Sequence, residues 1–243
     1  MAVQISHHYK CIFVHVPKAG GTSIETSSLF DDQRNISGDY VGGHLTASEY
    51  RERFPDEFER YFKFSFVRNP FDRLVSAFFY LNNLRGTNKY DRKIYNDYLL
   101  KYKRDFNKFC LNLLECNDVN KLTHFKPQAE FLCDSQGNIL VDFIGKVENF
   151  KNDLSVVKRK VNYFGFIGHK LKSKHKYYAH YYNDKTIEIV NKVYWQDLKV
   201  FGYTFENSTW NQISYLFRDT LILSQYFNLE KIKFKLNKLS KLK

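Results

Sequence analysis

A short apolar run that ends in a glycine-bearing loop is the feature that most constrains this chain. Residues 11–16, CIFVHV, have the β-branched and aromatic composition of a buried strand, and PKAGGT at 17–22 predicts a turn into a helix that begins around SIETSSLF. A strand, loop and helix in this order direct several backbone N–H groups toward one point, where an anion is stabilised. The segment therefore predicts a phosphate-binding loop, with a plain connecting turn as the alternative.

The same order recurs further along the chain. KFSFVR at 63–68 predicts a second strand, and the next segment predicts a helix with Asn69 as its N-cap and Pro70 at its first position. The apolar residues of this helix recur at helical spacing and share one face: Phe71, Leu74, Val75, Phe78 and Phe79. This segment is a second strand–helix unit.

A third repetition completes the pattern. LVDFIGKVE at 140–148 predicts a buried strand, and the helix after it has its apolar residues on one face: Phe150, Leu154, Val157 and Val161. Residues 183–203 predict another helix, which is capped by Asn183 or Asp184 and stops at Gly202. The alternation indicates one α/β domain, in which a central, mainly parallel sheet is flanked by helices and binds ligands at the carboxyl ends of its strands.

Arg68 and Ser76 form a second candidate anion site. Arg68 is expected at the carboxyl end of the second strand, and Ser76 about two helical turns later, on the face of the helix that also carries Arg73 and Tyr80. An arginine and a serine so placed can hold a terminal phosphate from two directions. The alternative is an ordinary ion pair at Arg68 and a solvated serine.

Charge and composition limit the class of protein. The chain has 38 Lys and Arg residues against 26 Asp and Glu, and its formal net charge of +12 attracts nucleic acid, anionic membranes, acidic glycans or phosphorylated cosubstrates. Neither a membrane span nor a signal-peptide pattern is visible, so a soluble, cytoplasmic protein is expected. The four cysteines lack CxxC spacing, so neither a zinc site nor an obligatory disulfide is expected.

Together, the two candidate anion sites resemble those of the sulfotransferases that use adenosine 3′-phosphate 5′-phosphosulfate (PAPS), especially the membrane-associated carbohydrate class with its heparan sulfate 2-O and chondroitin-type enzymes. HVPKAGGTS resembles the loop that grips the 5′-phosphosulfate, and VRNPFDRLVS resembles the segment that grips the 3′-phosphate. YVGGHL and HFKPQAEFLC are similar to further segments of that family. The resemblance implies a P-loop-like sulfotransferase domain over residues 1–205 and leaves 206–243 as a basic, helical extension.

The resemblance implies a role for each matching residue. The donor would contact the loop and the arginine–serine segment: Lys18, Ala19, Gly20, Gly21, Thr22, Ser23, Arg68 and Ser76. Lys18 would also act in catalysis, near the oxygen that bridges phosphate and sulfate. His124 and Gln128 would either lie near the acceptor or support the fold. The reaction would transfer a sulfuryl group to a hydroxyl of a glycan or glycolipid, release adenosine 3′,5′-bisphosphate and require no metal.

His44 is the candidate general base, because YVGGHL resembles the segment whose histidine has that role in the family. Thr46 and Glu49 have the spacing of a capping box for a helix that starts near Ala47, so His44 falls just before a helix N-terminus. That position disfavours the imidazolium form and leaves the ring able to accept a proton. Glu49 is the second candidate base, and His15 is expected to pack inside the first strand.

Two other functions stay open. A basic nucleic-acid-binding protein would use the net charge and the many aromatic residues, although the charge follows no recognisable binding motif. A P-loop nucleotide kinase is disfavoured because the loop lacks the GK[ST] sequence.

Two basic stretches have alternative interpretations. The resemblance implies a loop that closes over the nucleotide at Lys170, Lys172, Lys174 and Lys176, and a solvated loop is the alternative. In the C-terminal extension, one helical face carries Leu229, Ile232, Leu236 and Leu239 with lysines around it. We expect this extension to dock on the domain or to contact an anionic membrane surface near a lipid-linked acceptor.

Overall fold

The computed structural model describes residues 3–33, 44–83, 89–112, 119, 122–168 and 175–205. The chain divides into two units, residues 1–204 and 205–243. The predicted C-terminal extension falls outside the described residues from position 206 onward.

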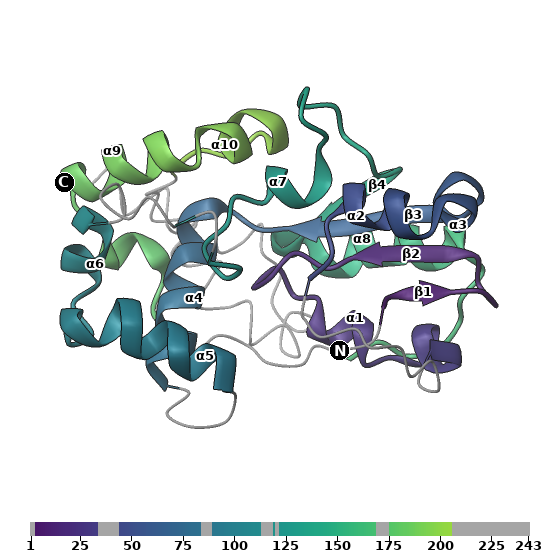
Figure 1. Cartoon of the computed structure of the whole chain (residues 1–243), viewed down its shortest axis with the longest axis horizontal. Coiled ribbons are helices and arrows are strands. Elements are labelled where there is room, and N and C mark those ends of the chain that lie inside the picture. Colours follow the sequence, from purple (N-terminus) through teal and green to yellow (C-terminus); the bar gives the residue numbers. More distant parts are fainter. Residues whose placement is uncertain are drawn as a thin grey trace, which may run out of the picture. The chain divides into compact units, whose positions relative to one another are not determined.

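One sheet organises the described residues (Figure 1). Its strands are β1 (Ile5–Ser6), β2 (Cys11–Val14), β3 (Phe62–Val67) and β4 (Phe143–Lys146), in the spatial order β1-β2-β3-β4. Strands β2, β3 and β4 are parallel, and β1 pairs antiparallel to β2. This arrangement confirms the expected α/β fold with a mainly parallel sheet. It also sets the carboxyl ends of β2 and β3 side by side, with Val14 opposite Ser65.

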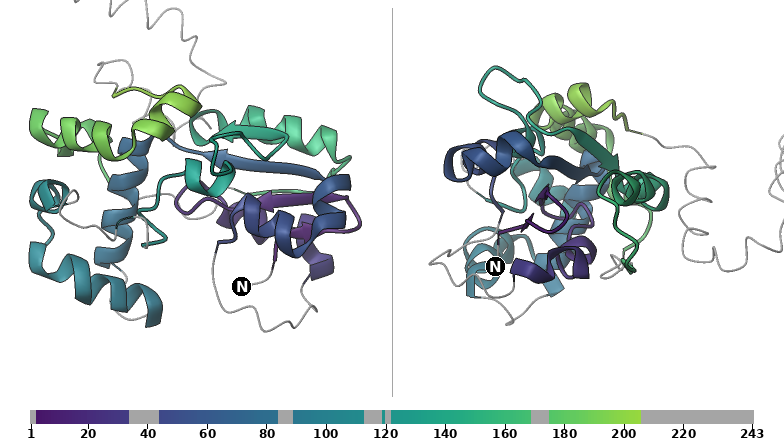
Figure 2. Two further views of the ribbon diagram at one scale, coloured as in Figure 1. Left: turned by 45° about the horizontal axis from the view of Figure 1, so that its top comes forward. Right: turned by 90° about the vertical axis from the view of Figure 1, so that its right-hand side faces the viewer.

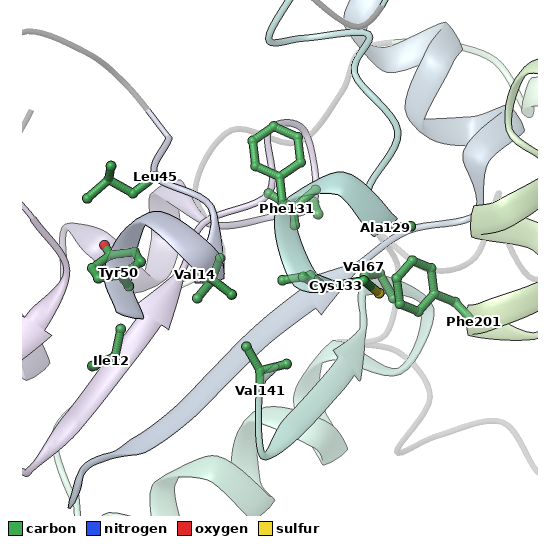
Figure 3. Close-up of a cluster of buried hydrophobic side chains, with 14 of the residues drawn as sticks. Ile12, Val14, Leu45, Tyr50, Val67, Ala129, Phe131, Cys133, Val141 and Phe201 are labelled. Carbon is green, nitrogen blue, oxygen red and sulfur yellow. The ribbon is translucent and has the colours of Figure 1, made fainter. Parts of the chain in front are cut away.

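Alternate residues of the strands face two hydrophobic cores. Ile12, Val14 and Val67 belong to one core, which helices and loops complete through side chains that include Leu45, Tyr50, Ala129, Phe131, Cys133, Val141 and Phe201 (Figure 3). The residues between them, such as Phe13, Phe64 and Phe66, belong to the other core, together with Ile24, Leu154 and Val157. The apolar runs of the sequence are thus buried on both faces, as parallel strands require.

Helices cover both faces of the sheet (Figure 2). On the first core lie α2 (Ala47–Arg53), α3 (Pro55–Arg60), α7 (Ala129–Leu132) and α10 (Trp195–Phe201). On the second core lie α1 (Thr22–Glu25) and α8 (Phe150–Lys160). The other α-helices of the described residues are α4 (Pro70–Asn83), α5 (Lys89–Ile94), α6 (Phe106–Asn112) and α9 (Asp184–Val193). Helix α4 leads directly from β3 and packs against α5.

The predicted helix starts are confirmed where a side chain caps the backbone. Thr46 and Glu49 form the expected capping box, in which the Glu49 N–H donates to Thr46 Oγ1 at 3.2 Å and the Thr46 N–H donates to Glu49 Oε2 at 2.7 Å. Asn69 Oδ1 accepts a hydrogen bond from the Phe71 N–H at 3.1 Å, and Pro70 is the first residue of α4. These bonds join residues two or three positions apart, which is why local spacing predicts them.

Several predicted elements are shorter than expected. The helix after the glycine loop is a single turn, because the hydroxyls of Thr26 and Ser27 donate to backbone carbonyls of that turn. The third strand ends at Lys146, because Val147–Asn149 turns into a 3₁₀ helix. The predicted helix at 183–202 is two helices that meet at Tyr194.

Tyr194 caps both of those helices and accounts for the break between them. Its ring is buried, and its hydroxyl donates to the carbonyl of Phe125 at 2.7 Å. Asn183 caps the first helix and Gly202, in the left-handed conformation, caps the second, as the sequence predicts.

Candidate functional site

The glycine loop leaves the carboxyl end of β2 and turns back through two residues with positive φ, Lys18 at 65° and Gly20 at 78°. A Cβ atom on Gly21 would lie 2.0 Å from a carbon of the His15 ring, so only glycine fits there. Within the described part of the chain, the N–H groups of Gly20, Gly21 and Thr22 donate no hydrogen bond. Since α1 has one turn, the loop amides rather than a helix dipole are the groups available to bind an anion.

Arg68 lies directly after β3 and joins that strand to the loop. Its Nε and Nη2 both donate to Asp72 Oδ2 at 2.7 Å, and its Nη1 donates to the carbonyl of Lys18 at 3.4 Å. The ion pair that the sequence left as an alternative is therefore present. The ion pair with Asp72 holds the guanidinium of Arg68 toward the glycine loop. Arg68 can therefore keep this ion pair and also contact an anion bound at the loop.

Gln128 holds the backbone of Arg68. The Arg68 N–H donates to Gln128 Oε1 at 2.9 Å, and Gln128 Nε2 donates to the Arg68 carbonyl at 2.8 Å. Gln128 is fully buried, and Asp197 accepts its backbone N–H. Of the two roles left open by the sequence, Gln128 therefore has the one that supports the fold.

Arg73 is a site residue that sequence reasoning missed. It is buried, and it donates through Nε to the carbonyl of Pro17 at 2.9 Å and through Nη2 to the carbonyl of Lys126 at 2.8 Å. The same guanidinium therefore ties the glycine loop to the segment that carries His124. The face of α4 expected to be polar is buried against these carbonyls. The sequence feature that could have identified Arg73 is its place as the second arginine of VRNPFDRLVS.

Ser76 lies on the same helix, one turn beyond Arg73, and is 2% exposed. It is not the solvated helix residue of the alternative interpretation. Ser23, the last residue of the predicted donor loop, is buried in α1.

The side chain of Lys18 lies in a polar cluster next to the loop. Its Nζ is 3.7 Å from the centroid of the Tyr80 ring, and the Tyr80 hydroxyl donates to Asp91 Oδ2 at 3.0 Å. His124 Nε2 donates to the other oxygen of Asp91 at 2.8 Å. Burial, reinforced by the charge of Arg68 and opposed by Asp91, lowers the pKa of Lys18 to about 7. The neutral amine form of Lys18 can therefore gain a proton when an anion binds nearby.

His44 packs against His15 at the entrance to the loop. Its Nδ1 lies 3.0 Å from the carbonyl oxygen of His15, and the two rings meet edge to face at 4.4 Å between centroids. A carbonyl only accepts, so Nδ1 carries the proton and Nε2 keeps its lone pair. Burial first, and then the neighbouring His15, lowers the pKa of His44 to about 3. The ring is neutral, as expected, and burial is the largest cause.

The two other candidate bases, Glu49 and His15, both have hydrogen-bond partners within the protein. Glu49 Oε2 accepts from both the N–H and the hydroxyl of Thr46, so its cap position accounts for it. His15 lies beyond the end of β2, and its Nδ1 pairs with Glu25 Oε2 at 2.8 Å. Glu25, which the sequence did not single out, holds the ring that packs on Gly21 and His44.

The predicted basic loop is described only in part. Lys170, Lys172 and Lys174 lie outside the described residues, while the N–H of Lys176 donates to the Tyr181 hydroxyl. His175 Nε2 lies 3.9 Å from Asp72 Oδ1. The chain thus returns to the carboxylate that orients Arg68.

In the described ranges, no group of three or more His, Cys, Asp or Glu side chains is placed to hold a metal ion. No helix in those ranges has both the length and the apolar character needed to cross a membrane. Among the described residues, Cys11, Cys110 and Cys133 are buried and take part in no disulfide, and Cys116 lies outside the described residues.

Comparison with known proteins gives one match. The sequence model described as the Sulfotransferase family matches residues 2–204. No curated protein and no solved structure matches the chain.

Proposed function

This chain belongs to the sulfotransferase family, and we propose that it transfers a sulfuryl group from PAPS to a hydroxyl of a glycan or glycolipid. The contact between Arg68 and the Lys18 carbonyl carries the proposal. It joins the two candidate anion sites at the carboxyl ends of neighbouring parallel strands, where ligands of such sheets bind.

The residues present fit a donor with phosphate groups at both ends of its ribose. Within the described residues, the backbone N–H groups of Gly20, Gly21 and Thr22 donate to no protein acceptor. They could therefore donate hydrogen bonds to the oxygens of the 5′-phosphosulfate. Arg68 and Ser76 suit the 3′-phosphate, since both are buried and the guanidinium is fixed by Asp72. Arg73 keeps the loop in position through the Pro17 carbonyl.

In the proposed reaction, His44 is the general base and Lys18 stabilises the leaving group. As the acceptor oxygen bonds to sulfur, Nε2 of His44 takes its proton, and the bond from sulfur to the bridging oxygen breaks. Lys18 stabilises the negative charge that develops on that oxygen, and adenosine 3′,5′-bisphosphate leaves. The free imidazole is a weak base because its pKa is low, but the negative charge of a bound donor favours the imidazolium that forms. None of these groups requires a metal.

An assay with radiolabelled PAPS and a panel of glycan and glycolipid acceptors tests the proposal. Transfer of label to one acceptor class, with release of adenosine 3′,5′-bisphosphate, is the expected result. Binding of ATP in preference to PAPS would favour the kinase alternative. Tight, salt-dependent binding of DNA or RNA without PAPS affinity would favour the nucleic-acid alternative.

Three further aspects stay predictions. His124 is proposed near the acceptor, with Asp91 holding its ring. The residues after 205 are proposed to contact a membrane surface, as their lysines and spaced leucines suggest. The cytoplasmic location expected from the sequence also stays a prediction.

A further inference from the structure

Two phenylalanines project into solvent from the turn that follows α8. Phe164 and Phe166 are 87% and 88% exposed, whereas the next most exposed large apolar side chain of the described residues, Trp195, is 58% exposed. A single exposed apolar residue needs no explanation, but two full-sized rings one residue apart form a local apolar projection.

The turn that carries them is anchored on both sides. Tyr163 is buried, its N–H donates to the Lys158 carbonyl at 2.9 Å, and its hydroxyl lies 2.8 Å from Ser28 Oγ. Ile167 packs on the second core. Exposed and inward-facing residues therefore alternate along the turn, so the two rings project from a fixed base.

Positively charged residues directly precede this projection in the chain. The last turn of α8 contributes Lys158, Arg159 and Lys160, and Lys158 Nζ lies 5.6 Å from the centroid of the Tyr163 ring, next to Phe164. Over the described residues 154–168, the chain has three Lys and Arg and no Asp or Glu. The partner of such a surface should be anionic.

We propose that the last turn of α8 and the turn at 163–168 form a membrane-docking surface, on which Phe164 and Phe166 enter an anionic lipid bilayer while the lysines and arginine contact its headgroups. A bilayer can surround both faces and the edge of each ring with hydrocarbon, whereas stacking on a sugar or a base covers only part of a ring, so a hydrocarbon partner fits two such exposed rings better. This proposal does not depend on the sulfuryl-transfer activity.

Other occupants fit the charge less well. The C-terminal extension carries lysines at 231, 233, 235, 238 and 241, and would bring like charges together. A second copy of the chain, docked through the same surface about a two-fold axis, would do the same.

Vesicle flotation of the full chain tests the surface. We compare the wild type, a Phe164→Ser/Phe166→Ser variant and a control Leu100→Ser/Leu111→Ser variant, which removes two apolar side chains that are 52% and 43% exposed elsewhere. Neutral phosphatidylcholine vesicles are compared with vesicles that also contain phosphatidylglycerol. The wild type should favour the anionic vesicles, the phenylalanine variant should lose about tenfold or more in partitioning, and the control should match the wild type.

Two measurements make the result decisive. Matching thermal unfolding of the three proteins shows that the variants fold, and a Phe166→Trp variant should gain fluorescence quenching by brominated lipid chains beyond that of the wild type. Equal partitioning of the wild type and the phenylalanine variant, or no partitioning of the wild type, overturns the proposal. Wild-type self-association that the phenylalanine variant loses would also overturn it, since a second copy would then cover the rings.

Discussion

Nδ1 of His44 donates a hydrogen bond to the backbone carbonyl of His15 at 3.0 Å, which fixes the tautomer of the candidate base. The lone pair is thereby on Nε2, the atom that must accept a proton in sulfuryl transfer. The same carbonyl belongs to the residue that begins the glycine loop. Base and donor loop are therefore positioned by one backbone segment.

Replacing His44 by alanine should lower turnover by about 10²- to 10⁴-fold while the affinity for adenosine 3′,5′-bisphosphate stays nearly intact, because the proposed base would meet the acceptor rather than the nucleotide. Steady-state kinetics and calorimetry measure the two effects. Glu49→Gln is the matched control: it can keep the capping bonds to Thr46 but cannot take up a proton. Loss of turnover in Glu49→Gln and not in His44→Ala would reverse the assignment.

The low pKa of His44 makes stability depend on pH. The unfolded chain takes up this proton near pH 6.5 and the folded chain only near pH 3, so the free energy of unfolding falls as the pH drops through this range. Between pH 7.5 and pH 5 the contribution of His44 should be roughly 2 kcal/mol.

Urea unfolding of the wild type and of His44→Gln at both pH values isolates this contribution. The glutamine variant should lose less stability on acidification than the wild type. Equal losses would show that the pKa of His44 is close to its ordinary value in the folded chain. The low pKa of His44 in the free protein also implies that any acid limb of kcat/KM due to this residue lies well below pH 6.5.

Donor binding should be coupled to proton uptake by Lys18. The pKa of this side chain is about 7 in the free protein, and a bound phosphate would raise it, so up to about one proton should be taken up at pH 8. Calorimetric titrations with adenosine 3′,5′-bisphosphate in buffers of different ionisation enthalpy measure the uptake. It should disappear in Lys18→Met. Uptake that persists in the variant would have to come from another group.

Gly21→Ala should disable the donor loop. The added methyl group would overlap the His15 ring, so the loop or the ring must move, at a cost of about 1–3 kcal/mol in stability. Affinity for adenosine 3′,5′-bisphosphate should fall as well. Gly137→Ala is a useful control, because its Cβ would meet nothing within 4 Å, although alanine is strained at its φ of 86°, whereas Gly21 has a φ of −63°. That variant should lose some stability and keep its nucleotide affinity.

Sequence patterns predicted the parts of this molecule that depend on nearby residues. The strands follow from β-branched and aromatic runs, and the caps at Thr46 and Asn69 follow from bonds to residues a few positions away. The glycine loop between β2 and α1 was likewise predicted, while its anion-binding role stays a prediction.

Contacts between distant segments could not be predicted in this way. Helical periodicity places Arg73 opposite an apolar face, but only the folded chain shows that the carbonyls of Pro17 and Lys126 cover it. Gln128 similarly acquires its role from Arg68, far away in sequence. The pairing of Glu25 with His15 depends on how the single turn of α1 is set against β2.

The central claim, that Arg68 and the glycine loop bind a nucleotide with a 3′-phosphate, is tested most directly by calorimetry with two ligands. Wild-type protein should bind adenosine 3′,5′-bisphosphate more tightly than AMP, which lacks the 3′-phosphate. Arg68→Ala should lose about 1.5–3 kcal/mol of that preference and leave the AMP affinity little changed. If the wild type binds the two nucleotides equally, or if Arg68→Ala retains the full preference, the donor site does not lie where the account places it.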